Sequence, residues 1–137
     1  MEIIDSKNYV DKAEKVIIGL ITDAKKAKRN PRNEYDYDIL TTSQLRKQLS
    51  MTAEMYAQAD KESSDTLSEE LLDRIEYLRV QFAYQAGREK DVKKFIVEAR
   101  ILEILKTING SRRDFLTFCR YMEALVAYRK FYGKEDK

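Results

Sequence analysis

One long amphipathic stretch, residues 71–88, constrains the fold more than any other part of the sequence. Its apolar side chains recur at steps of three and four residues, which is the spacing of one helix face. They are Leu71, Ile75, Leu78 and Phe82. Tyr77, Val80 and Tyr84 add apolar surface away from that stripe, so we predict a buried helix in the middle of a bundle. Gly87 is expected to end it in the left-handed conformation.

The scarcity of turn-forming residues indicates that the rest of the chain is helical as well. The 137 residues include one proline and four glycines, which are too few for the turns of a many-stranded sheet. Hydrophobic residues make up 43% of the chain and charged residues 36%, as in a globular protein with a solvated surface. The length suits one core. We therefore predict an all-α fold, a compact bundle of about five helices in a single domain covering residues 1–137.

Capping patterns indicate where the other helices begin and end. Thr41, with Gln44 three residues later, matches the capping box, in which each side chain bonds the other residue's backbone N–H. Further predicted start signals are Ser6, either Thr66 or Ser68, Asp91, and Ser111 with Asp114. Predicted stop signals are Asn109-Gly110 and Gly133. One continuous helix is expected between Asp91 and Ile108.

Residues 25–40 form a basic segment that leads into a linker. Four cations, Lys25, Lys26, Lys28 and Arg29, follow the first helix, and Pro31 then breaks it. Cations suit a helix C-terminus, which carries partial negative charge, so solubility and helix stabilisation explain the cluster. A phosphate-attracting flap is the alternative. The stretch from Tyr35 to Leu40 is expected to be extended or irregular, and to become ordered only against the bundle or a partner.

The sequence is poor in catalytic chemistry. It contains no histidine, which removes the usual general base and the commonest zinc ligand. Cys119 is the only cysteine and lies among apolar neighbours, so we expect a small core residue rather than a nucleophile. Glu69, Glu70 and Asp73 are close together, but carboxylates at a helix start serve the helix dipole. We predict no enzymatic activity, no catalytic residues, no metal and no cofactor.

Bulk properties limit the class of partner and the location. The formal net charge of +2 is too small to argue nucleic-acid binding by itself, although a local basic patch remains compatible with it. The N-terminal residues carry no apolar secretion signal, and no apolar run reaches the ~20 residues that span a bilayer. We therefore expect a cytoplasmic protein with no membrane partner.

Two groups of cations are candidates for surface recognition. Arg46 and Lys47 follow a helix start, where positive charge opposes the dipole unless an anion occupies the site. An ordinary charged face explains them equally well. The last helix interleaves cations with aromatic residues, a pattern that can hold phosphates and stack on bases. These cations are Arg120, Arg129 and Lys130. The same spacing also describes an amphipathic helix whose tyrosine rings lie in the core.

Three blocks of sequence, in order, resemble a known family. They are residues 41–51 (TTSQLRKQLSM), 77–88 (YLRVQFAYQAGR) and 118–133 (FCRYMEALVAYRKFYG), and residues 8–14 (NYVDKAE) agree with them. On these blocks the chain resembles the small helical subunit of the type III-A CRISPR effector, the Csm complex. The resemblance covers nearly the whole chain; the polar stretches 35–40 and 60–68 do not contribute to it.

The resemblance implies a non-catalytic structural role in antiviral defence. In such complexes several copies of the small subunit stack as an inner filament, against the backbone subunits and along the duplex of guide RNA and target RNA. Cleavage belongs to the backbone and large subunits. Basic residues inside the matched blocks then become candidates for sequence-independent contact with the RNA backbone. They are Arg46, Lys47, Arg79, Arg88, Arg120, Arg129 and Lys130.

Three functional hypotheses follow. The first is an RNA-contacting structural subunit that binds guide and target RNA, other Csm subunits and further copies of itself. The second is a bundle that only scaffolds protein partners and makes no direct RNA contact, its cations pairing with acidic neighbours. The third is a small enzyme that uses carboxylates without histidine. A steep dependence of RNA binding on salt separates the first from the second, and metal-dependent turnover identifies the third.

Overall fold

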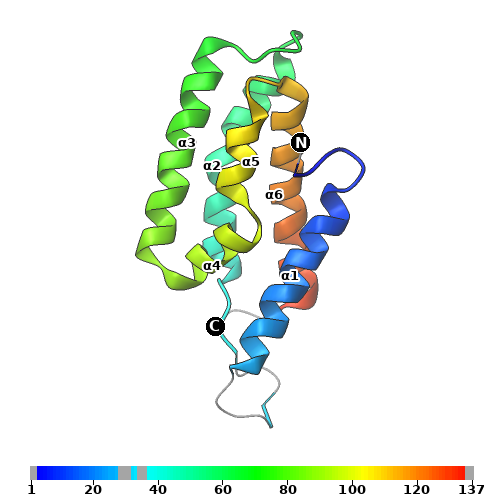
Figure 1. The fold of residues 1–137 in the computed structure, drawn as a ribbon, viewed down its shortest axis with the longest axis vertical. Helices are drawn as coiled ribbons and strands as arrows, with labels where there is room; N and C mark the ends of the chain where they lie inside the picture. The colour runs from blue at the N-terminus through cyan, green and yellow to red at the C-terminus, as the bar shows by residue number, and fades with distance from the viewer. Residues whose placement is uncertain (1–2, 28–31, 34–36, 135–137) are drawn as a thin grey trace.

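The described part of the chain, in a computed structural model, comprises residues 3–27, 32–33 and 37–134. Within these residues it forms six α-helices and no named strand. The helices are α1 (Tyr9–Lys26), α2 (Thr42–Lys61), α3 (Glu69–Arg88), α4 (Lys90–Glu98), α5 (Ile101–Ile108) and α6 (Arg112–Tyr132). The predicted all-α helical bundle is confirmed (Figure 1).

Helix α6, rather than α3, occupies the centre of the bundle. It packs along both α1 and α2 and also contacts α5, whereas α3 packs on α2, α4 and α5 from the outer flank (Figure 1). The predicted stripe of α3 is buried, but Tyr77, Val80 and Tyr84 are exposed. The prediction of a central α3 was therefore wrong, because apolar residues off the main stripe of a helix are not necessarily buried.

Every helix contributes buried residues to the core, which includes an aromatic cluster that joins α3 to α6. Phe82 of α3 meets Phe118 edge-on, with ring centres 6.4 Å apart, and Phe118 in turn stacks against Phe115. All three rings are fully buried. Aromatic rings contribute large apolar areas to a core, so this cluster is a main source of stability.

The predicted helix between Asp91 and Ile108 is two helices instead. Arg100 adopts the left-handed conformation (φ 58°, ψ 38°) between α4 and α5. The break rotates the following turn so that Ile101 is fully buried, two positions after the buried Ala99. A continuous helix cannot bury both positions on one narrow face, because residues two apart point about 200° away from each other. The Tyr121 hydroxyl donates to the Ala99 carbonyl (3.0 Å), which the break leaves without a helical partner.

The structure tests the predicted helix ends one by one. Ser68 and Ser111 cap α3 and α6 as expected, accepting from Leu71 N and Asp114 N. Ser6 does not cap α1, which begins at Tyr9 after Asn8. Asn109 and Gly110 are left-handed and end α5, and Gly133 ends α6. Gly87 lies inside α3 and is not left-handed; the chain turns into α4 through the extended Glu89.

The basic segment and linker are only partly described. Lys28, Arg29 and Pro31 lie outside the described residues, as do residues 34–36. Tyr37 and Leu40 are buried against the bundle, so the final part of the segment is packed rather than free of it. This packing leads directly into the start of α2.

Replacing Thr41 by alanine is expected to destabilise the start of α2. The capping box is present: Gln44 N donates to Thr41 Oγ1 (3.0 Å) and Thr41 N donates to Gln44 Oε1 (2.8 Å). Loss of the hydroxyl leaves one helix N–H without its partner, so we expect the free energy of unfolding to fall by about 1 kcal/mol. Urea unfolding followed by circular dichroism measures this. Ser43→Ala, at the neighbouring exposed position, is the control and should change stability by less than about 0.5 kcal/mol.

Candidate functional site

Two of the predicted cations, Lys47 and Arg88, lie at the same end of the α2–α3 pair. The two helices run antiparallel, since Arg74 near the start of α3 contacts Gln58 near the end of α2. The start of α2 therefore lies beside the end of α3 (Figure 1). Lys47 lines a groove together with Tyr84, and the Arg88 guanidinium lies 5.6 Å from the centre of the Tyr84 ring. Both cations are exposed.

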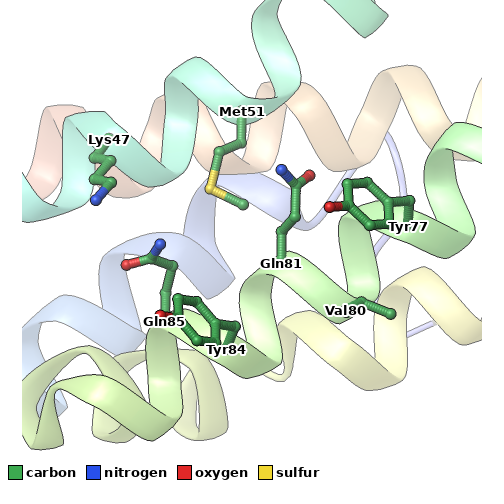
Figure 2. A pocket seen from close by; sticks show the side chains of 7 residues that line it. All are labelled: Lys47, Met51, Tyr77, Val80, Gln81, Tyr84 and Gln85. Carbon is green, nitrogen blue, oxygen red and sulfur yellow. The ribbon is translucent and has the colours of Figure 1, made fainter.

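The groove between α2 and α3 is mostly apolar and open to solvent. It has a volume of about 460 Å³ and is lined from α2 by Lys47 and Met51 (Figure 2). Its α3 side consists of Tyr77, Val80, Gln81, Tyr84 and Gln85. Tyr77 is 64% exposed, Val80 59% and Tyr84 62%, so these side chains form a raised apolar edge rather than part of the core.

A second hollow continues the groove toward the other end of the two helices. It shares Met51, Tyr77 and Gln81 with the groove and adds Glu54 and Asp73. Glu54 pairs with Arg74 at 3.5 Å, a partly exposed ion pair that screening by water makes weak. The combined surface is therefore basic at the end with Lys47 and Arg88 and more acidic at the end with Asp73.

The other predicted cation of α3, Arg79, is not part of this surface. It forms an ion pair with Glu76 at 3.0 Å. Arg79 and Arg88 are nine positions apart, which is about two and a half helical turns and puts them on opposite sides of α3. The two arginines therefore cannot bind the same stretch of a ligand, although they lie in the same block of sequence.

Arg46, Arg120 and Lys130 are exposed and do not line the groove. A hydrogen bond with the Tyr56 hydroxyl raises the pKa of the Arg120 guanidinium, so Arg120 lies beside Tyr56. Tyr56 follows Lys47 by about two and a half turns of α2 and thus faces the opposite way. Arg46 and Lys130 are not among the residues that line the groove.

Arg129, another predicted RNA contact, is a core residue. Only 2% of it is exposed, and its Nε donates to the Leu40 carbonyl (3.0 Å) while its Nη1 donates to the Lys134 carbonyl (2.9 Å). These bonds tie the segment before α2 to the segment after α6. The prediction that Arg129 contacts RNA does not agree with this burial, because a guanidinium held inside the bundle cannot reach a phosphate outside it.

The described residues offer little for catalysis. Cys119 is buried, and this burial raises the pKa of its thiol far above the ordinary value, so the reactive thiolate is suppressed. No group of three or more His, Cys, Asp or Glu side chains in the described ranges is placed to hold a metal ion. Among the same residues, no helix combines the length and apolar character needed to cross a membrane.

Comparison with known proteins identifies the family. The family model described as Csm2 Type III-A matches residues 20–135. A "CRISPR system Cms protein Csm2" of Streptococcus thermophilus is 48% identical over 136 residues, covering 99% of this chain and 100% of the relative. The protein of the same name from Mycobacterium tuberculosis (strain CDC 1551 / Oshkosh) is 44% identical over 130 residues, 95% of each chain.

The chain belongs to the Csm2 type III-A family. A further Csm2 protein, from Enterococcus italicus, is 40% identical over 99 residues, 71% of each chain. The matched range of the family model begins within α1 and includes α2 to α6. The predicted family resemblance is therefore confirmed, and it rests on the whole bundle rather than on one motif.

The structure of this Csm2-family chain also reveals site residues that the sequence did not indicate. Met51, Gln81 and Gln85 line the groove, and Tyr77, Val80 and Tyr84 were assigned to a buried helix. A signal was present: Tyr77, Val80 and Tyr84 share a side of α3 with Asp73 and Arg88, whose charges mark that side as solvated. The two flanking charges were available in the sequence as evidence against burial.

Proposed function

We propose that this chain is the small, non-catalytic subunit of a type III-A CRISPR–Csm ribonucleoprotein and acts in antiviral defence in the cytoplasm. It contacts the backbone of the guide RNA–target RNA duplex and stacks in several copies as an inner filament, beside the backbone and large subunits. The family membership supports the assignment to the complex. The burial of Cys119 suppresses the one thiol of the chain as a nucleophile, which supports a role without chemistry.

The observation that carries the RNA contact is the convergence of Lys47 and Arg88. They come from different helices. Lys47 lines the groove that Tyr84 also lines, Arg88 lies over the Tyr84 ring, and within the described part of the chain neither cation is ion-paired with a carboxylate. Two exposed cations held by rigid helices can neutralise phosphates without reading bases. A subunit that serves any guide sequence requires contacts of this kind.

The remaining exposed cations take a different part in this proposal. Arg46, Arg120 and Lys130 do not line the groove, and Arg120 lies beside Tyr56, on the other side of α2 from Lys47. We assign them to acidic surfaces of neighbouring subunits. Arg79 already has Glu76 as a partner, and Arg129 is structural.

Removing both cations is expected to weaken RNA binding by the assembled complex. The double variant Lys47→Ala/Arg88→Ala should lower target RNA affinity by about thirtyfold, because each of the two lost phosphate contacts costs close to 1 kcal/mol. The slope of log affinity against log salt should become shallower by about 0.7–0.9 for each lost contact. Target affinity is measured across a salt series, and native mass determination confirms that the complex still assembles.

The matched control removes two cations from other surfaces. Arg79→Ala/Lys106→Ala lowers the net charge by the same amount but leaves Lys47 and Arg88 in place. An RNA effect confined to the first double variant supports the proposal. Equal affinity and slope in wild type and both variants would instead leave a subunit that scaffolds protein partners and makes no direct RNA contact.

A further inference from the structure

Tyr84 presents an exposed aromatic ring at the basic end of the groove between α2 and α3. The residue is 62% exposed, and the Arg88 guanidinium lies over its ring, 5.6 Å from the ring centre. Lys47 lines the same groove from the opposite helix. A face of the ring is therefore accessible to a flat group, because a flat guanidinium already lies over it.

Two glutamines line the groove with unused hydrogen-bonding groups. Gln81 and Gln85 are half-buried on its α3 side (Figure 2). Within the described part of the chain, neither side-chain amide has a hydrogen-bond partner. Each amide offers an acceptor oxygen and a donor nitrogen. A purely apolar partner would cover these groups without satisfying them, at a cost in binding free energy, so the groove suits a ligand with polar edges.

One unpaired nucleotide combines the groups that this end of the groove can bind. Its base has a flat aromatic face for Tyr84 and polar edges for the two amides, and its phosphate carries negative charge for the two cations. The groove volume of about 460 Å³ lies within the range of roughly 300–1,000 Å³ for small-molecule sites. A base inside a duplex is covered on both faces by its neighbours, so the base that stacks on a side chain has to be unpaired.

Binding of a base would move Arg88 from the ring to the phosphate. An exposed cation over an aromatic ring strengthens a contact about twofold to fivefold, whereas a base stacked on such a ring strengthens it about fivefold to 150-fold. The base is therefore expected to replace the guanidinium on Tyr84. The displaced guanidinium can then bind the phosphate of the same nucleotide, where its charge is neutralised.

We propose that Tyr84 stacks with an unpaired base of the bound RNA. Lys47 and Arg88 hold the adjoining phosphate. Gln81 and Gln85 form hydrogen bonds with the edge of the base. Every base has an aromatic face, and an amide can turn to donate or to accept, so this pocket takes any base and suits a subunit that serves any guide. The base contact rests on the proposed RNA function and adds to its backbone contacts.

Removing the ring is expected to weaken RNA binding without changing its salt dependence. In the assembled complex, Tyr84→Leu should lower target RNA affinity about fivefold or more, because leucine is apolar but has no aromatic face. The slope of log affinity against log salt should keep its wild-type value, since no charge is lost. Tyr84→Phe keeps the ring and should behave as wild type.

Tyr77→Leu is the matched control on the same helix. Tyr77 is 64% exposed and lines the same groove, but it lies about 10 Å from Tyr84 along α3, away from the two cations. The change from tyrosine to leucine is the same at both positions. Tyr77→Leu should therefore change target RNA affinity by less than about twofold.

Guide and target RNAs that lack one base at a time show whether the ring binds a base. An abasic residue keeps its phosphate, so the charge of the RNA does not change. Where the missing base only pairs with the other strand, its loss should cost wild type and Tyr84→Leu the same affinity. Where it stacks on Tyr84, its loss should cost about fivefold or more in wild type and in Tyr77→Leu but close to nothing in Tyr84→Leu. Such coupling identifies two groups that touch.

Coupling between an abasic position and Tyr84, but not Tyr77, supports the stacked base. Absence of coupling at every position overturns it, as does a Tyr84→Leu complex that binds RNA as tightly as Tyr77→Leu. Native mass determination checks assembly, and circular dichroism of the isolated variants checks their fold. A folded Tyr84→Leu chain that no longer assembles, while Tyr84→Phe does, would assign the ring to a protein partner and also overturn the stacked base.

Failure of the stacked base and failure of the proposed RNA function give different results. If only the stacked base is wrong, Lys47→Ala/Arg88→Ala still binds RNA more weakly and with a shallower salt slope than wild type. If the backbone contact is wrong, that double variant keeps the wild-type slope, whatever the Tyr84 variants show.

Discussion

Phe118→Ala is expected to lower the free energy of unfolding by about 3–5 kcal/mol, the range for truncating a buried aromatic residue. Phe118 is fully buried and packs against both Phe82 of α3 and Phe115 of α6. Truncation removes the contact that joins the central helix to the outer one and leaves a cavity that rigid helices cannot close. A loss of this size is a large share of the 5–15 kcal/mol that stabilises a typical domain.

The measurement is urea unfolding followed by circular dichroism, with the midpoint and slope fitted together. The control is Phe131→Ala on the same helix, because Phe131 is 76% exposed and its loss should cost less than about 0.5 kcal/mol. Similar values for the two variants would contradict the central position of the Phe118 cluster. Since α3 carries the candidate interface, Phe118→Ala should also weaken RNA binding when the complex is warmed.

Arg129→Met is expected to lower the free energy of unfolding by about 2–3 kcal/mol. Methionine fills much of the same space but cannot donate, so the Leu40 carbonyl loses a charge-assisted hydrogen bond while remaining buried. The Lys134 carbonyl loses its bond as well, but it lies near the chain end and can turn toward water. The effect should therefore concentrate on the segment that leads into α2.

Hydrogen exchange identifies that location directly. In Arg129→Met the amides at the start of α2 should exchange faster, whereas those in the middle of α3 should keep their protection relative to global unfolding. Lys130→Met, at the adjacent exposed position, is the control and should leave both stability and exchange near wild type. Unchanged exchange at the start of α2 would show that Arg129 does not tie this segment to α6.

A comparison of Lys47 with Arg129 shows why the cations of the candidate site could be predicted only in part. Lys47 and Arg129 both lie in sequence blocks that resemble the Csm2 family, and both look like surface cations in the sequence. One is exposed beside a groove and the other is buried between two carbonyls. Local sequence does not distinguish these cases, because the carbonyl of Leu40 is far from Arg129 along the chain.

The sequence by itself determined the all-α class, the family, the caps that start α2, α3 and α6, and the buried stripe of α3. These follow from spacing and capping, which act within a few residues. Only the tertiary structure decided that α6 is central, that the chain breaks at Arg100, that Arg129 is buried, and that Lys47 and Arg88 lie at the same end of the α2–α3 pair. Each depends on contacts between residues distant in the chain, and these arise from packing whole helices together rather than from any local pattern.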